Sequence, residues 1–217
     1  ASGRRQLLRL GVSPHRGNLL LPTILSAFYR QFPSCEVHTV ELSITLLRLQ
    51  LDAKQLDFIV DVPSPDTVTY CNELLLNEPI LLAVPRSFLP RIQPQSGALE
   101  LNALSGEPFI LLPPEQMLGG ICQKMCEQAG FLPDLRLQCS SVERALSLAA
   151  QQLGITFAPL IFAQRQFYGE ELCYFHIARV ETCRPLALVY PRSSYQSAPL
   201  KAMLELFRIQ VPKLYGL

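Results

Sequence analysis

The fold is decided by residues 7–22, which read Leu7-Leu8-Arg9-Leu10-Gly11-Val12-Ser13-Pro14-His15-Arg16-Gly17-Asn18-Leu19-Leu20-Leu21-Pro22. The apolar run is typical of a buried strand that ends near Ser13. A polar turn follows, and then a helix whose first turn carries Pro22. This order brings a Ser, a His, an Arg and free backbone N–H groups to the carboxyl end of a strand, where open α/β sheets bind small ligands. Helix N-termini also attract anions. The stretch therefore predicts a binding site for a small ligand.

Strands and helices are expected to alternate along the rest of the chain. The helix over 18–32 places Leu21, Ile24 and Phe28 on one face, and Pro33 ends it. Ser43 is the expected cap of the next helix. Further strands are predicted at 36–42, 56–61, 73–85 (two segments joined at Pro79), 109–112, 135–139, 155–158, 172–177 and 184–190. Further helices are predicted at 116–129, with Gly130 as its stop, at 140–153, with Ser140 as its cap and Gly154 as its stop, and from Ser197 onward. Successive strand–helix–strand units imply a parallel sheet with right-handed crossovers.

The pattern divides the chain into two α/β units. Residues 5–84 form subdomain I together with 184–217, which returns to it, and residues 85–183 form subdomain II. Two chain crossings, near 84 and 160–184, would make a hinge with a ligand cleft between the subdomains. The expected fold class is therefore α/β, in two units.

Composition excludes several classes of protein. The 217 residues carry 19 Lys and Arg against 18 Asp and Glu, a net charge of +1, so no basic nucleic-acid face is expected. No apolar run approaches the roughly 18 residues of a membrane span. Seven cysteines at irregular spacing predict reduced thiols in a cytoplasmic protein rather than a disulfide framework. The opening Ala1-Ser2-Gly3 lacks an initiator Met and suggests a piece of a longer protein.

Several short motifs together resemble a known family, the effector-binding domain of LysR-type transcriptional regulators. These motifs are Leu10-Gly11-Val12-Ser13-Pro14, Leu21-Pro22, Phe32-Pro33, Leu56-Asp57-Phe58-Ile59-Val60-Asp61, Glu78-Pro79-Ile80-Leu81-Leu82-Ala83-Val84-Pro85, Glu107-Pro108-Phe109-Ile110-Leu111-Leu112-Pro113, Ala129-Gly130-Phe131 and Leu153-Gly154-Ile155-Thr156-Phe157-Ala158-Pro159. Each motif is weak alone, but their order and spacing are fairly specific and cover nearly the whole chain.

The resemblance implies a fold of the periplasmic-binding-protein type (type 2), with two Rossmann-like subdomains around a ligand cleft. It also implies a small-molecule effector, with a carboxylate favoured, and a side-by-side antiparallel homodimer to which the helix at 18–32 contributes. Members of the family usually carry an N-terminal winged helix-turn-helix, which this chain lacks. DNA would therefore be contacted only through that missing part, and no cofactor is expected.

The resemblance also assigns the effector site. Ser13 and the loop Pro14-His15-Arg16 match the segment that holds an effector's carboxylate, although many relatives have small hydroxyl residues at the last two positions. The loop Pro113-Pro114-Glu115-Gln116 would face it from subdomain II. Ser140 and Ser141 match a helix start that lines the cleft, and Phe157 and Pro159 match a strand end near the hinge.

Each of these residues also has an ordinary structural interpretation. Ser13 and Ser140 would then be helix caps, while Arg16 and His15 would be solvated surface residues. Asp57 and Asp61 suggest acid–base chemistry, but we expect Asp57 to begin a strand and Asp61 to lie in a loop, where it would bond the ligand or a neighbouring N–H.

Two other functions remain open at this point. A solute-binding receptor of a transport system would share the fold, but it predicts few or paired cysteines. An enzyme on this scaffold would need a catalytic constellation, and no such motif is found. Cys122 and Cys126 lie one helical turn apart without a second ligand pair, so no metal site is expected.

Overall fold

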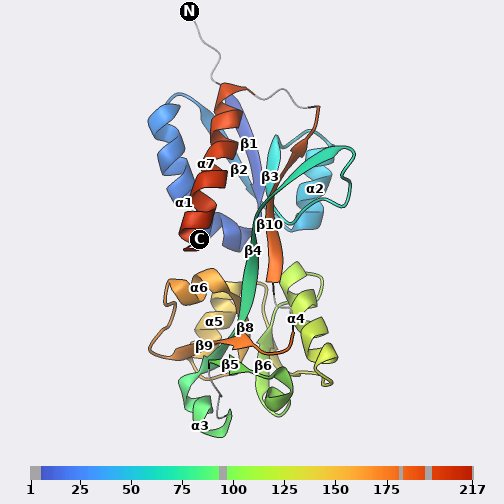
Figure 1. Cartoon of the computed structure of the whole chain (residues 1–217), viewed down its shortest axis with the longest axis vertical. Coiled ribbons are helices and arrows are strands. Elements are labelled where there is room, and N and C mark those ends of the chain that lie inside the picture. The colour runs from blue at the N-terminus through green and yellow to red at the C-terminus, as the bar shows by residue number, and fades with distance from the viewer. Residues whose placement is uncertain (1–5, 93–96, 181–182, 194–196, 217) are drawn as a thin grey trace, which may run out of the picture. The chain divides into compact units, whose positions relative to one another are not determined.

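The computed structural model describes residues 6–92, 97–180, 183–193 and 197–216 (Figure 1). The chain divides into two compact units, unit 1 with Ala1–Asn77 and Arg184–Leu217, and unit 2 with Glu78–Cys183. The first boundary lies inside strand β4 (Tyr70–Pro85), seven residues before the expected boundary at 84/85 (84 − 77 = 7), and the second lies at 183/184.

Unit 1 is built on a mixed sheet. Its other strands are β1 (Leu7–Val12), β2 (Glu36–Glu41), β3 (Phe58–Asp61) and β10 (Cys183–Pro191), in the order β2-β1-β3-β10-β4. β1 pairs in parallel with β2 and with β3, as the strand–helix–strand pattern predicts. β10 is antiparallel to β3, so the expectation of a purely parallel sheet is wrong at this strand, which returns from the other unit.

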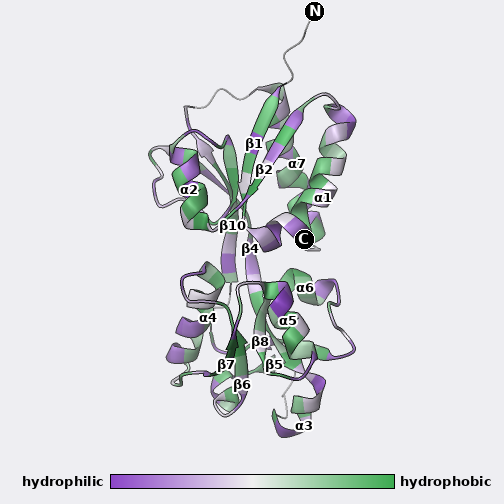
Figure 2. Cartoon of the chain, turned by 180° about the vertical axis from the view of Figure 1, so that it is seen from behind, coloured by the Kyte–Doolittle hydropathy of each residue, from purple (hydrophilic) through white to green (hydrophobic). Residues whose placement is uncertain are grey.

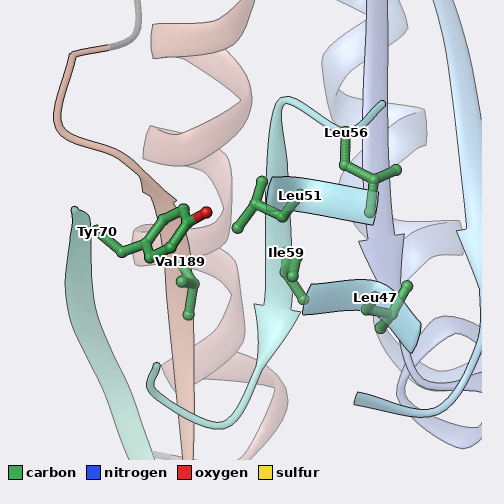
Figure 3. Packing of buried hydrophobic residues seen from close by; sticks show 6 residues of the cluster. All are labelled: Leu47, Leu51, Leu56, Ile59, Tyr70 and Val189. Atoms are coloured by element: carbon green, nitrogen blue, oxygen red, sulfur yellow. The ribbon is translucent and has the colours of Figure 1, made fainter. Parts of the chain in front are cut away.

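Helices cover both faces of this sheet. α1 (Pro14–Gln31) packs against α7 (Ala198–Leu214), and α2 (Ile44–Asp52) contacts β1 and β3 (Figure 1). Side chains alternate along β3, because successive residues of a strand point to opposite faces. The Phe58 ring meets Phe207 of α7, whereas Ile59 packs in the cluster beneath α2 (Figure 3). Figure 2 shows β1 as largely hydrophobic beside the more hydrophilic β2.

The strands of unit 2 belong to a two-stranded sheet and to the eight-stranded sheet that includes β4. β6 (Pro108–Leu111) pairs in parallel with β7 (Asp134–Gln138), while β8 (Thr156–Pro159) and β9 (Leu172–Ile177) pair antiparallel with β4. The two longer helices are α4 (Met117–Gln128) and α5 (Val142–Ala150). The short elements are η1 (Arg86–Phe88), α3 (Leu89–Ile92), β5 (Ala98–Leu99), η2 (Leu101–Leu104) and α6 (Leu160–Gln164).

Several expected element boundaries need correction. β4 runs unbroken through Pro79, so there are not two joined segments. Gly130 follows α4 with a φ of 86°, as predicted for a helix stop, but Gly154 does not end α5. The left-handed residue after α5 is Gln152, with a φ of 64°. Gly154 instead allows a close approach, because a Cβ there would lie 2.7 Å from the Pro108 carbonyl oxygen.

Candidate functional site

α1 begins directly after β1, four residues earlier than the sequence suggested. Ser13 is the N-cap in an extended conformation, Pro14 occupies the first turn, and the Gly17 N–H donates to the Ser13 carbonyl at 2.9 Å. The expected polar turn is therefore the first turn of the helix, because proline favours this position and its missing N–H costs nothing there. His15 and Arg16 consequently have fixed helical positions at the carboxyl end of β1.

The Ser13 hydroxyl does not cap α1. Its oxygen is buried and has no hydrogen-bond partner among the described residues. Ser43, the N-cap of α2, also makes no side-chain cap bond, so the expectation that it caps the helix is wrong in that respect, but Ser43 is exposed to water. A buried hydroxyl without a partner is costly, and it points to a ligand or a bound water at this position. The Ser13 hydroxyl is therefore a candidate contact for a ligand at this helix start.

Arg16 is completely buried, so it is not a solvated surface residue. Its Nη1 donates to Oδ1 of Asp61 at 2.7 Å, and its Nη2 donates to the Pro185 carbonyl at 3.2 Å. The exposed fractions of the two charged side chains are 1% and 7%. Ions buried to this degree lose hydration, which only a close opposite charge and further hydrogen bonds offset. Arg16 therefore joins α1 to β3 through a buried ion pair and to β10 through a hydrogen bond.

Asp61 is the last residue of β3 rather than a loop residue. Its Oδ1 also accepts a hydrogen bond from the Val62 N–H at 2.9 Å. A bond to a neighbouring N–H was one of the two alternatives predicted for this side chain. Its Oδ2 is buried and has no partner among the described residues. The Asp61 carboxylate thus uses Oδ1 to bind Arg16 and the backbone at the end of β3. Its Oδ2 remains available as an acceptor beside the first turn of α1.

His15 is paired with a buried arginine. Arg184 of β10 lies with its Nη2 2.7 Å from Nε2 of His15. Because a guanidinium can only donate, Nε2 must be the unprotonated acceptor, and the imidazole is neutral with its proton on Nδ1. Burial of the ring, together with the positive charges of Arg184 and Arg16, holds the pKa of His15 well below its usual value. His15 is therefore an uncharged member of this group at neutral pH.

In unit 2 the predicted residues of the 113–116 loop and the α5 start lie near each other. The loop leads from β6 into α4, and the Gln116 side chain donates to the Ser140 carbonyl at 3.2 Å. The cap of α5 is Ser141 rather than Ser140, because its hydroxyl accepts from the Arg144 N–H at 3.3 Å and donates to Glu143 at 2.8 Å. Pro114 and Glu115 are exposed, and Pro113 is partly buried.

Phe157 and Pro159 lie in the interior of unit 2. The Phe157 ring stacks on Phe109, with 6.0 Å between centroids and an interplanar angle of 21°. Pro159 ends β8, where it pairs with Ile80 of β4, and it is buried. Both residues contribute to core packing in unit 2.

Sequence reasoning missed Arg184 and Pro185. Arg184 stands within a strand whose other residues are mostly buried, and its exposed fraction is only 3%. A charge in a buried strand needs a partner, and that was the available signal. Nothing in the sequence distinguishes the Pro185 carbonyl from any other.

The cysteines carry free thiols, and two of them lie on the inner face of α4. Burial, with a smaller contribution from Glu127, raises the pKa of Cys126 to about 11. Burial also raises the pKa values of Cys35 and Cys139. Over the described ranges, no group of three or more His, Cys, Asp or Glu residues is placed to hold a metal ion. None of the helices in the same ranges is both long and apolar enough to cross a membrane.

Comparison with known proteins assigns the family. The model of the LysR substrate binding domain matches residues 1–211. A hydrogen peroxide-inducible genes activator of Pectobacterium carotovorum subsp. carotovorum is 27% identical over 183 residues, covering 84% of this chain and 60% of that protein. The chain thus spans about three fifths of the length of this curated relative. Such relatives are transcription regulators rather than enzymes.

Solved structures show the same fold. The C-terminal domain of a probable LysR family regulator from Rhodococcus sp. RHA1 has a TM-score of 0.80 and 20% identity, covering 94% of this chain and 99% of that one. The BenM effector binding domain with its effector benzoate has a TM-score of 0.78 and 20% identity, covering 97% and 94%. The fold is thus the two-subdomain, periplasmic-binding-protein-like α/β fold of these domains. The chain belongs to the LysR substrate binding domain family.

Proposed function

We propose that this chain is the effector-sensing part of a longer LysR-type transcription regulator. A small effector binds at the group formed by Ser13, His15, Arg16 and Asp61 and stabilises one conformation of the regulator over others. The change in population then alters how a separate DNA-binding part engages DNA. The family match supports this function and does not favour the alternative of a transport receptor.

The observation that carries the proposal is the buried Ser13 hydroxyl without a partner at the start of an 18-residue helix. A small carboxylate suits this position for two reasons. The first turn of α1 contains no acidic residue, and the helix N-terminus carries partial positive charge. The Ser13 hydroxyl would donate to the carboxylate. Neutral His15 would border the site without adding a charge of its own.

Seven further residues are secondary members of the proposed site: Pro113, Pro114, Glu115, Ser140, Ser141, Phe157 and Pro159. The hydrogen bond from the Gln116 side chain to the Ser140 carbonyl connects the 113–116 loop to the start of α5. This connection supports roles for Ser140 and Pro113. The core positions of Phe157 and Pro159 favour an indirect role, in which they support the neighbouring backbone.

Peroxide sensing is a second function suggested by the name of one relative. Peroxides attack the thiolate form of cysteine, so a sensor thiol needs a lowered pKa. Burial raises the pKa values of Cys35, Cys126 and Cys139, which reduces their thiolate fraction. These three thiols are therefore poorly suited to direct oxidation by peroxide.

The test is a binding titration with a panel of small carboxylates, read by calorimetry and native mass spectrometry. Ser13→Ala should weaken the binding of any carboxylate that the protein takes up by about tenfold, the usual effect of losing a hydrogen bond to a charged group. Ser43→Ala is the matched control, because it removes a cap hydroxyl that likewise makes no cap bond in the same unit. Equal affinity in wild type and Ser13→Ala would contradict the site.

The proposal includes a homodimer to which the helix residues 18–32 contribute. Sedimentation velocity at micromolar concentration checks this part. A monomer throughout would contradict it without affecting the effector site.

A further inference from the structure

A pocket lies in unit 1, between α2 and the segment that follows β3. Its volume is about 180 Å³. Leu51, Tyr70 and Val189 form its apolar floor, and they belong to the buried cluster drawn in Figure 3. Arg48 and Asp52 of α2 line it together with Ser64 and Asp66. The pocket therefore combines an apolar floor with charged groups of both signs.

Arg48 is held in place and has a donor to spare. Its Nη2 donates to the Pro63 carbonyl at 2.8 Å, which fixes the guanidinium against the segment after β3. Its Nε is buried and has no hydrogen-bond partner among the described residues. A guanidinium N–H group favours a carboxylate, which can accept charge-assisted hydrogen bonds. One part of the pocket thus suits an anionic oxygen.

Asp52 lies one helical turn after Arg48, and its carboxylate is hydrogen-bonded to a hydroxyl. It accepts a hydrogen bond from the Tyr70 hydroxyl. Burial and the interaction with Asp52 raise the pKa of Tyr70 to about 12, so this hydroxyl stays a donor. Asp52 occupies the last turn of α2, where no basic residue stands and the backbone carbonyls add partial negative charge. The Asp52 end of the pocket therefore favours a cation.

The opposite wall is rigid. Asn72 of β4 ties Ser64 at both ends, accepting from its N–H at 2.7 Å and donating to its carbonyl at 3.0 Å. Ser64 Oγ accepts from the Asp66 N–H at 3.2 Å, and Asp66 accepts from the N–H groups of Val68 and Thr69 at 3.0 and 2.9 Å. Because these bonds fix the loop to β4 and to itself, binding would need little ordering of this wall.

We propose that this pocket binds a small zwitterion of the α-amino acid class, with its carboxylate on Arg48 and its ammonium group toward Asp52 and Asp66. The volume of about 180 Å³ is sufficient for a molecule as small as alanine. The assignment is independent of the effector site at Ser13, with which the pocket shares no residue.

The test is an NMR titration of the 15N-labelled chain with L-alanine, propionate and ethylamine. Propionate lacks the ammonium group of alanine, and ethylamine lacks its carboxylate. We expect L-alanine to shift the Arg48 Nε–H signal and the Ser64 and Asp66 amides in a saturable way. Each of the two analogues should bind at least about tenfold more weakly, because each loses one charged contact.

Substitutions separate the possible outcomes. Arg48→Lys keeps the charge but removes the Nε donor, and Asp52→Asn keeps the hydrogen bond from Tyr70 but removes the charge; both should reduce the affinity for L-alanine. Arg30→Lys on the exposed face of α1 is the control and should leave it unchanged. Ser13→Ala should also leave it unchanged, which distinguishes this pocket from the effector site. Equal binding of propionate and L-alanine, or no saturable shift with L-alanine, would overturn the proposal.

Discussion

The two ends of β3 carry the same pair of residue types in opposite settings. At the amino end, Asp57 accepts from the Arg9 backbone N–H at 2.7 Å and from its guanidinium at 2.9 Å, and the two side chains keep 25% and 38% of their surface exposed. At the carboxyl end, the Asp61–Arg16 pair is buried almost completely. Water screens the first pair and not the second, so chemically identical pairs differ in what they contribute. Of these two ends, only the buried one also holds a buried hydroxyl without a described hydrogen-bond partner, that of Ser13.

The largest expected difference between the two ion pairs is seen when each aspartate is neutralised in turn. Asp61→Asn leaves the buried Arg16 guanidinium without its carboxylate, so we expect a loss of about 3–5 kcal/mol in the free energy of unfolding. Asp57→Asn should cost about 1 kcal/mol or less, because its pair is partly solvated and an amide oxygen can still accept from the Arg9 N–H. Urea denaturation of the two variants measures both values.

A similar loss in the two variants would contradict the contrast. The slope of each transition with denaturant provides the control, because an unchanged slope shows that the variants unfold from a comparably compact state. A small loss for Asp61→Asn with an unchanged slope would mean that the Arg16 site is hydrated in solution.

The pH dependence of stability sharpens the contrast further. His15 lies at the buried end, and its pKa is lowered by burial and by the positive charges of Arg184 and Arg16. The unfolded chain takes up a proton on this residue below about pH 6.5, whereas the folded chain does not. Stability should therefore fall as pH drops from about 6.5 toward 5, by up to about 1.4 kcal/mol per pH unit from this residue.

His15→Gln should flatten that part of the profile, since its amide oxygen can accept from Arg184 in place of Nε2. His38→Gln is the matched control, because His38 lies on β2 with an exposed side chain beside Glu36. Thermal unfolding followed between about pH 5 and 7.5 compares the three proteins across the unperturbed histidine pKa. Parallel profiles for His15→Gln and wild type would show that His15 protonates freely in the folded protein.

The fold was largely predictable because its signals are local. β1 and β3 are apolar runs bounded by polar residues, and Leu21, Ile24 and Phe28 are buried as their helical spacing predicts. The start of α1 was missed because Pro14 and Gly17 resemble a turn, although the dipeptide Ser13-Pro14 is also a helix-start signal. Such errors move a boundary without changing the order of elements in unit 1.

The candidate site was less predictable because its partners are distant in sequence. The partner of Arg16 lies 45 residues away, and that of His15 lies 169 residues away. No periodicity within a short window carries that information, so Arg16 resembled an ordinary surface charge. The position at a strand's carboxyl end was predictable, whereas the buried pairing depends on how β3 and β10 meet α1.

Salt concentration gives the smallest effect, and it tests the physical cause of the comparison. A double-mutant cycle over Arg9→Met and Asp57→Asn should give a coupling free energy of about 0.5 kcal/mol at low salt, and it should decline toward zero near 1 M, where the screening length is only about 3 Å. The same cycle over Arg16→Met and Asp61→Asn should give a larger coupling that changes little, because ions cannot enter between the buried groups. If the couplings of both pairs declined together, burial would not be what distinguishes the two ends of β3, and water would have to reach Arg16.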